Sequence, residues 1–268
     1  MTPKMHLGKI RKCKFHVPHL KVEVLSWRTF RKATICTNVC ICVRRLYRLG
    51  MDAQPGTYGY TRAACTILTH LVCTIFTILI TVLSRPGSSL FSWHPFLMTL
   101  AFSFFMTEAI LVFSPHGSPF RMFPHKSKGR LHWVLQCLGL ACAALGFVAI
   151  VYNKHLAGKA HFTSWHGLTG LVTVCVVGIQ CLAAVSLIYP SLVKGWSLAK
   201  LKRYHAAAGL LTYLLGGGSL FLGVSSVWFT ASVGELAWYL TALCPVLSSL
   251  VIMSQVSNAY MAKKRLQS

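Results

Sequence analysis

The chain has very few acidic side chains. It contains four Asp and Glu against 27 Lys and Arg in 268 residues, and from residue 60 onward the only acids are Glu108 and Glu235. Hydrolysis by paired carboxylates, a Ser/His/Asp triad and the binding of hard cations all require acidic groups. The sequence therefore argues strongly against these kinds of site.

Charge of either sign is scarce over most of the chain. Charged residues make up 12% of the sequence, hydrophobic residues make up 54%, and the mean hydropathy is +0.58. A soluble domain has about a quarter of its residues charged, and a helix that crosses a bilayer needs about 20 apolar residues. Six runs are long enough, and they predict transmembrane helices at 63–83, 93–114, 131–152, 166–188, 205–228 and 236–257.

Two further signals are missing. The eleven cysteines include no Cys-x-x-Cys pair and follow no regular spacing, so they do not indicate a disulfide framework. The glycine triplet at 216–218 lies inside an apolar run and not at a strand-to-helix turn, as a dinucleotide-binding loop would require. We expect an all-α polytopic membrane protein with six transmembrane helices.

The basic residues indicate how the helices are oriented. They concentrate before the first run, in the second and fourth connections and in the tail, whereas the first, third and fifth connections carry few or none. Because Lys and Arg favour cytosolic loops, both termini are predicted to be cytosolic. We therefore attribute the net charge of +23 to topology, to anionic lipid and to attraction of a small anionic substrate, and not to nucleic acid.

The chain divides into three parts by composition. Residues 1–59 form a basic extension, which we expect to be poorly ordered and in which Met51 is a candidate alternative start. Residues 60–263 form the transmembrane domain, and residues 264–268 form a cytosolic tail.

Four histidines occupy matching positions in the predicted helices. His94 and His132 are 38 residues apart, and His166 and His205 are 39 apart. The string Ser-Trp-His occurs at the start of both intervals and ends in His94 and His166. Each histidine lies near the start of its own helix, and successive helices run in opposite directions. The repeat predicts a four-helix core made of helices 2–5, flanked by helices 1 and 6, with His94 and His166 near the non-cytosolic face and His132 and His205 near the cytosolic face.

Paired imidazoles at two depths are typical of haem ligation. A porphyrin brings four nitrogens of its own and needs only two axial ligands, whereas zinc prefers four ligands and would be underfilled here. Glycines on the same faces, at 139, 146, 170 and 209, would leave room for flat macrocycles. We expect two haem b groups. The alternatives are a transporter or receptor that uses the histidines for protons or a ligand, and a scaffold subunit that keeps haem for stability.

The remaining polar residues suggest substrate sites at both faces. The cytosolic candidates precede His132 and His205 and are Lys126, Lys128, Arg130, Lys202 and Arg203. The non-cytosolic candidates are Arg85, Lys159 and His161. Glu108 is an intramembrane acid and hence a functional candidate, either as a proton partner for the cytosolic haem or as a counter-charge for a lysine. His70 has no counterpart in the repeat, and we interpret it as structural.

Three strings carry a resemblance to a known family. Arg-Pro-Gly-Ser-Ser-Leu-Phe-Ser-Trp-His-Pro (85–95), Leu-Ala-Lys-Leu-Lys-Arg-Tyr-His (198–205) and Val-Trp-Phe-Thr-Ala-Ser-Val (227–233), together with the four histidines, resemble the cytochrome b561 family over about residues 60–263. The resemblance implies that cytosolic ascorbate is the electron donor and that monodehydroascorbate or ferric iron (Fe3+) is the acceptor on the far side. It also implies an endoplasmic reticulum or vesicle membrane and a homodimer as one possible assembly.

Overall fold

The computed structural model describes the backbone of residues 57–265 and the side chains of residues 59–260. Most of the predicted basic extension and tail therefore lies outside the described residues, although α2 begins within the extension. In order, the helical segments are α2 (Thr57–Ser84), α3 (Leu90–Thr99), η1 (Leu100–Phe105), α4 (Met106–Leu111), α5 (His125–Leu156), α6 (Trp165–Ile188), η2 (Pro190–Leu192), α7 (Leu198–Val224), α8 (Val227–Thr230) and α9 (Glu235–Arg265).

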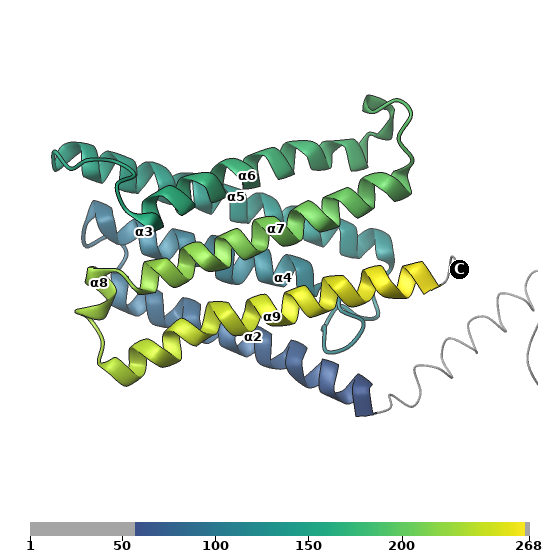
Figure 1. Ribbon diagram of the computed structural model, residues 1–268, viewed down its shortest axis with the longest axis horizontal. Helices are drawn as coiled ribbons and strands as arrows, with labels where there is room; N and C mark the ends of the chain where they lie inside the picture. Colours follow the sequence, from purple (N-terminus) through teal and green to yellow (C-terminus); the bar gives the residue numbers. More distant parts are fainter. Residues whose placement is uncertain (1–56, 266–268) are drawn as a thin grey trace, which may run out of the picture. The chain divides into compact units, whose positions relative to one another are not determined.

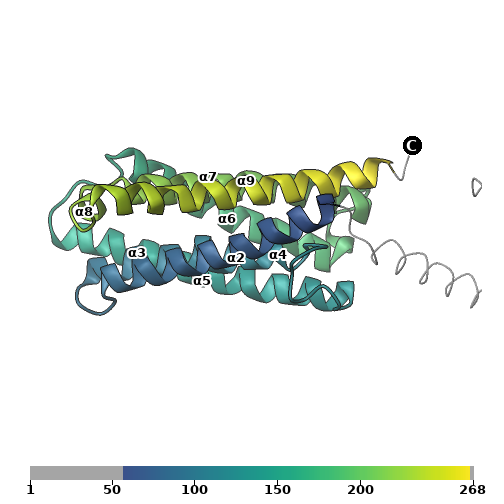
Figure 2. The same cartoon turned by 90° about the horizontal axis from the view of Figure 1, so that it is seen from below.

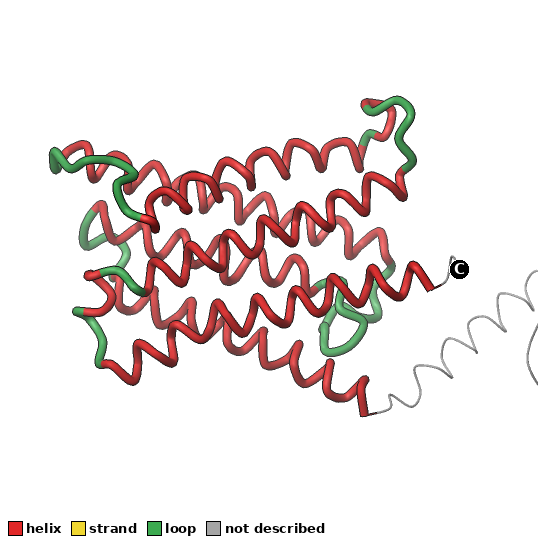
Figure 3. Tube along the Cα trace, viewed as in Figure 1, coloured by secondary structure: helices red, strands yellow, loops and turns green. Residues whose placement is uncertain are grey.

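The six predicted membrane helices are confirmed. Six helices among residues 57–265 are long and apolar enough to span a bilayer, and no strand occurs in that part of the chain (Figure 3). The second span is one continuous helix made of α3, η1 and α4. The third and fifth spans begin earlier than predicted, at His125 and Leu198, because their basic first turns are helical as well.

The helices of this unit lie in two layers (Figures 1 and 2). One layer holds α2, the α3–α4 span and α5, and the other holds α6, α7 and α9. Within the layers, α3 packs against α5 and α6 packs against α7, so the two predicted histidine hairpins are formed. The connections 112–124 and 189–197 lie at one end, here called the basic end, and the connections 85–89, 157–164 and 225–234 lie at the other, called the opposite end (Figure 1).

Helix α2 carries a row of threonines in an otherwise apolar sequence. The hydroxyl groups of Thr66, Thr69, Thr74, Thr77 and Thr81 each donate a hydrogen bond to the carbonyl oxygen four residues earlier, at 2.7–2.9 Å. These bonds give each threonine hydroxyl a partner that the hydrocarbon of a bilayer could not supply.

The second span is irregular at its centre. The backbone of η1 forms a π-helix, whose turns contain more residues than those of an α-helix. The side chains of α4 are therefore rotated about the helix axis relative to those of α3. Just beyond η1, the buried Thr107 hydroxyl lies 2.8 Å from the Tyr213 hydroxyl of α7. The π segment thereby sets which residues of α4 face the bundle, and Glu108 is among those that make contact with another helix.

Apolar side chains fill the space between the two ends. The central cluster contains Ala101, Phe102, Met106, Ala143, Val177 and Tyr213, contributed by the second span, α5, α6 and α7. A second cluster, around Phe76, Ile80 and Phe229, lies toward the opposite end. This packing holds the histidine-bearing helices at fixed separations.

Candidate functional site

The four predicted histidines lie close to helix starts but not at the first residue. His166 is the second residue of α6, whereas His94 is the fifth of α3, and His132 and His205 are each the eighth of α5 and α7. His94, His132 and His205 are therefore one to two turns inside their helices, whereas His166 is in the first turn of α6.

The histidines form two facing pairs, one toward each end. The ring centroids of His94 and His166 are 6.0 Å apart and their planes are inclined by 73°. The ring centroids of His132 and His205 are 6.1 Å apart and inclined by 80°. Each pair joins one helix from each layer, so the pairing expected from the repeat is what the fold brings together.

Three of the four imidazoles are oriented by a backbone carbonyl of a neighbouring helix. The Nδ1–H groups of His94, His132 and His166 donate to the carbonyl oxygens of Gly146, Ala109 and Ser219, at 3.1, 2.9 and 3.0 Å. A carbonyl oxygen can only accept, so the proton must be on Nδ1. The Nε2 lone pair of each ring is consequently available to a ligand.

The fourth imidazole is held differently. The Gln180 side-chain amide of α6 donates a 2.8 Å hydrogen bond to the His205 carbonyl oxygen, and the same Nε2 atom lies 3.1 Å from His205 Nδ1. At His205 an amide group that donates therefore stands where the other three rings have a carbonyl oxygen that accepts. The sequence analysis missed Gln180, whose only sequence signal is an amide in an apolar run.

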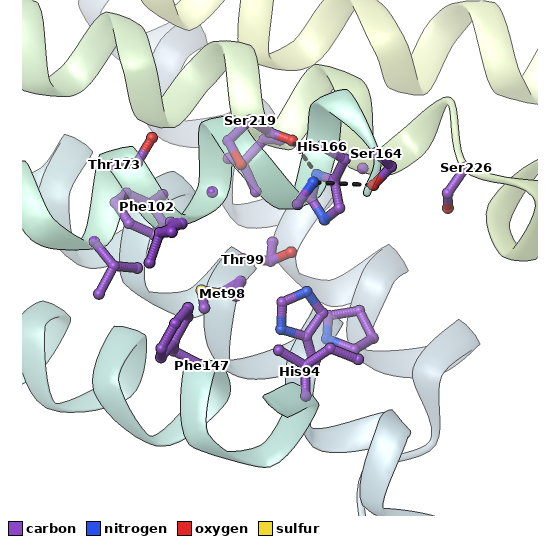
Figure 4. A pocket seen from close by; sticks show the side chains of 18 of the residues that line it. His94, Met98, Thr99, Phe102, Phe147, Ser164, His166, Thr173, Ser219 and Ser226 are labelled. Atoms are coloured by element: carbon purple, nitrogen blue, oxygen red, sulfur yellow. Dashed lines mark hydrogen bonds between the residues drawn. The ribbon is translucent and has the colours of Figure 1, made fainter. Parts of the chain in front are cut away.

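A cavity of about 260 Å3 separates His94 from His166 at the opposite end. Figure 4 shows the two rings across it, with Phe102, Phe147 and Thr173 deeper in the bundle. Phe147 stacks on Phe162, with ring centroids 6.1 Å apart, and Phe162 has a positive φ of 55° that few bulky residues adopt. This loop residue thus forms part of the wall.

The glycines on the histidine faces play several roles. Gly170 lines the cavity, as a site for a flat group requires. Gly139 and Gly146 instead allow α3 and η1 to approach α5, because an added Cβ would come within 3.4 and 3.0 Å of that span. Gly209 faces the Gln180 amide, 3.2 Å from where its Cβ would be.

The basic candidates lie at the same end as His132 and His205. Lys126, Lys128 and Arg130 are in the first turns of α5, and Lys202 and Arg203 are exposed in the first turns of α7. Lys128 is one helical turn before His132 and Lys202 is three residues before His205, so these two are on the histidine faces. Lys128 Nζ also donates to the Arg121 carbonyl oxygen.

The candidates at the opposite end are not all near the cavity. His161 lines it, whereas Arg85 and Lys159 are not among its lining residues. Lys154, near the end of α5, lines the cavity and donates a 3.0 Å hydrogen bond to the Ala160 carbonyl oxygen. The sequence analysis did not include Lys154 among the candidates, because the predicted helix ended at residue 152.

Comparison with known proteins agrees with this architecture. Residues 93–230 match the family described as eukaryotic cytochrome b561. The chain is 55% identical to human transmembrane reductase CYB561D2 over 219 residues, which are 82% of this chain and 99% of that protein. It is 42% identical to mouse probable transmembrane reductase CYB561D1 over 214 residues, 80% and 93% of the two chains.

A more distant relative comes from a plant. Ascorbate-specific transmembrane electron transporter 2 of Zea mays is 27% identical over 181 residues, 65% of this chain and 73% of that protein. The fold and the matches together define a polytopic membrane cytochrome. The chain belongs to the cytochrome b561 family, whose members bind haem.

The residues fit that group. An iron atom bonded to one nitrogen of each ring, at roughly 2 Å, places the two ring centroids roughly 6 Å apart, which is the separation found in both pairs. Among the described residues, no cluster of three or more His, Cys, Asp or Glu could hold a bare metal ion. Pairs of imidazoles suit a porphyrin, which supplies the other ligands itself.

Proposed function

We propose that the protein is a dihaem transmembrane reductase that takes electrons from cytosolic ascorbate and delivers them across the bilayer to monodehydroascorbate or ferric iron. The observation that carries the proposal is the pair of facing imidazoles near each end of the bundle, at ring separations of 6.0 and 6.1 Å. His94 and His166 would hold one haem b, and His132 and His205 the other.

Each bound haem supplies one-electron redox chemistry. The chain's own contribution is to orient and protect the ligands. The carbonyl oxygens of Gly146, Ala109 and Ser219 fix three rings with Nδ1 protonated, and such partners also raise the basicity of the ligating nitrogen. The four rings are partly buried among the helices, which would limit the access of water to the bound haems.

The basic end would be the cytosolic, donor-binding face. Ascorbate is an anion at neutral pH, and the first turns of α5 and α7, which precede His132 and His205, carry the lysines and arginines. We assign the main contacts to Lys128 and Lys202 because they lie on the histidine faces, with Lys126, Arg130 and Arg203 raising the local concentration of the anion.

The opposite end would be the acceptor-binding face. Lys154 and His161 line the cavity that contains His94 and His166, so they are placed to bind an anionic or chelated acceptor. Arg85 and Lys159 are exposed at the same end and would act only through long-range attraction. In this orientation both termini are cytosolic. We propose an endoplasmic reticulum or vesicle membrane as the location, and a homodimer remains a hypothesis.

Sealed vesicles test the proposal directly. Purified protein is reconstituted with an oxidised acceptor, a ferric chelate, trapped inside, and ascorbate is added outside. We expect reduction of the trapped iron that requires the protein, and fast bleaching of the oxidised haem spectrum in a stopped-flow experiment. Haem that ascorbate does not reduce would favour the scaffold alternative. Ascorbate flux without iron reduction would favour the transporter alternative.

A further inference from the structure

A histidine and a glutamate from different helices face each other inside the bundle. His70 of α2 and Glu108 of α4 are joined by a 2.7 Å contact between His70 Nδ1 and the carboxylate, and their side chains are only 21% and 19% exposed. Glu108 is the only acid inside the described membrane spans apart from Glu235, which begins α9. The interpretation of His70 as merely structural therefore omitted its partner.

The pair is connected to His132 through the backbone of α4. The residue after Glu108 is Ala109, whose carbonyl oxygen accepts the hydrogen bond from His132 Nδ1. The following residue, Ile110, accepts a 3.3 Å hydrogen bond from Gln255 of α9. Three consecutive residues of α4 are thus contacted by His70, His132 and Gln255.

Two polar atoms in this region lack a partner among the described residues. They are His70 Nε2 and the Gln255 side-chain oxygen, and both are shielded from solvent. A buried polar atom without a partner is costly and usually indicates a water or a functional role. Here His70 Nε2 is free to gain a proton while Nδ1 stays bound to the carboxylate.

We propose that the His70–Glu108 pair is a proton-binding site that gains one proton each time the basic-end haem gains one electron. This inference rests on the proposed function. Ascorbate supplies the electron, water on the cytosolic side supplies the proton, and both leave when the site is oxidised again. An added negative charge in a low-dielectric interior strengthens the hold of a nearby base on a proton, so uptake offsets the charge.

Other titratable groups surround the pair but cannot serve as well. Cys73 of α2 and Tyr213 of α7 are close enough to interact with the Glu108 charge, yet a thiol and a phenol are already protonated and have no proton to gain. His132 of α5 is engaged with Ala109. On α9 the facing group is Gln255, which does not titrate. In the second span the only other titratable group is His94, which lies at the opposite end. Arg62 lies two turns before His70 on α2 and is always charged.

A redox titration of the purified holoprotein at several pH values tests the inference. One proton bound per electron lowers a midpoint potential by about 59 mV per pH unit. We expect the potential of one of the two haems to fall with rising pH at close to this slope, and that of the other to show little dependence on pH. His70→Gln removes the base, and Glu108→Gln removes the negative charge that would hold the proton on it. Each keeps a side chain able to form a hydrogen bond, and both should flatten the slope. His155→Gln, an exposed histidine at the other end of α5, should leave it unchanged.

The outcomes separate this inference from the proposed function. Two haems whose potentials do not vary with pH, or a slope that survives both substitutions, would overturn the proton site and leave the electron path intact. A wild-type chain without haem would overturn the proposed function instead. If both variants fail to fold, the redox-induced infrared spectrum of the wild type decides. We expect a deuterium-sensitive carboxyl or imidazole band, and its absence would contradict the site.

Discussion

The two histidine pairs have almost the same ring separation but different supports. At the opposite end, both His94 and His166 donate to backbone carbonyls and line a cavity of about 260 Å3. At the basic end, His132 has a carbonyl partner, whereas His205 depends on the Gln180 side chain. The two pairs therefore have nearly equal ring separations but different hydrogen-bond partners.

This difference shows that some imidazole partners are set by helix packing and others by a single side chain. A carbonyl partner exists wherever two helices are in register, so no substitution removes it without moving a helix. A side-chain partner can be lost in one substitution. The basic end, which also has the His70–Glu108 pair nearby, is therefore the end whose electronic properties we expect side chains to adjust.

The largest expected effect comes from removing a ligand. His94→Ala and His205→Ala should each lower the haem content from two per chain to one, because one axial bond rarely retains the group. The pyridine haemochrome assay on purified protein measures this ratio. His161→Ala, which lines the cavity but is not in a pair, should keep both. Two haems retained in His94→Ala would contradict the opposite-end assignment.

Gln180→Leu should weaken the basic-end haem alone. Loss of a partner that orients a ligating histidine typically lowers affinity 10- to 100-fold, and here both the ring and the backbone of His205 lose a bond. Titration of haem into depleted protein gives the two affinities. Ser219→Ala is the matched control, because His166 bonds to its backbone oxygen. Equal affinities in Gln180→Leu and the wild type would contradict the role of Gln180.

Gly223→Ala should disturb only the opposite end. Its Cβ would come 3.2 Å from His166 Cε1, so the ring or the helix must move, at a cost of about 1–3 kcal/mol. Thermal unfolding of the holoprotein reports the loss. Gly218→Ala makes the same change in the same helix with no atom within 4 Å, and it should be neutral or slightly stabilising. Identical unfolding of the two variants would argue against close packing at His166.

The smallest effects are expected at the rim. Lys128→Ala and Lys202→Ala should each raise the ascorbate concentration needed for half-maximal haem reduction by several-fold, and the effect should shrink at high salt because it is electrostatic. Lys194→Ala, in the connection between α6 and α7, provides a control of equal charge. If Lys194→Ala has the same effect as Lys128→Ala and Lys202→Ala, these lysines act on ascorbate by long-range attraction and not by direct contact.

Periodicity and spacing were enough to predict the six spans and the two facing pairs. Apolar runs of sufficient length form membrane helices whatever surrounds them, and the 38- and 39-residue intervals specify hairpins with a histidine near each end. The helix starts of α5 and α7 were placed too late because their basic turns are not apolar, although they are helical.

The details of the site depend on contacts between distant residues, which spacing does not reveal. Gln180 meets His205 and His70 meets Glu108 only after α6 packs on α7 and the π segment rotates α4. The glycines on the histidine faces were all interpreted alike, yet Gly146 accommodates a neighbouring helix and Gly209 faces an amide. Such roles follow from tertiary structure and not from position in the repeat.

An experimental density map of the purified, haem-loaded protein would test the central claim most directly. The account predicts two planar densities, one between His94 and His166 and the other between His132 and His205, with an imidazole on each side of both. A single planar density, or imidazoles turned away from it toward lipid, would contradict the account.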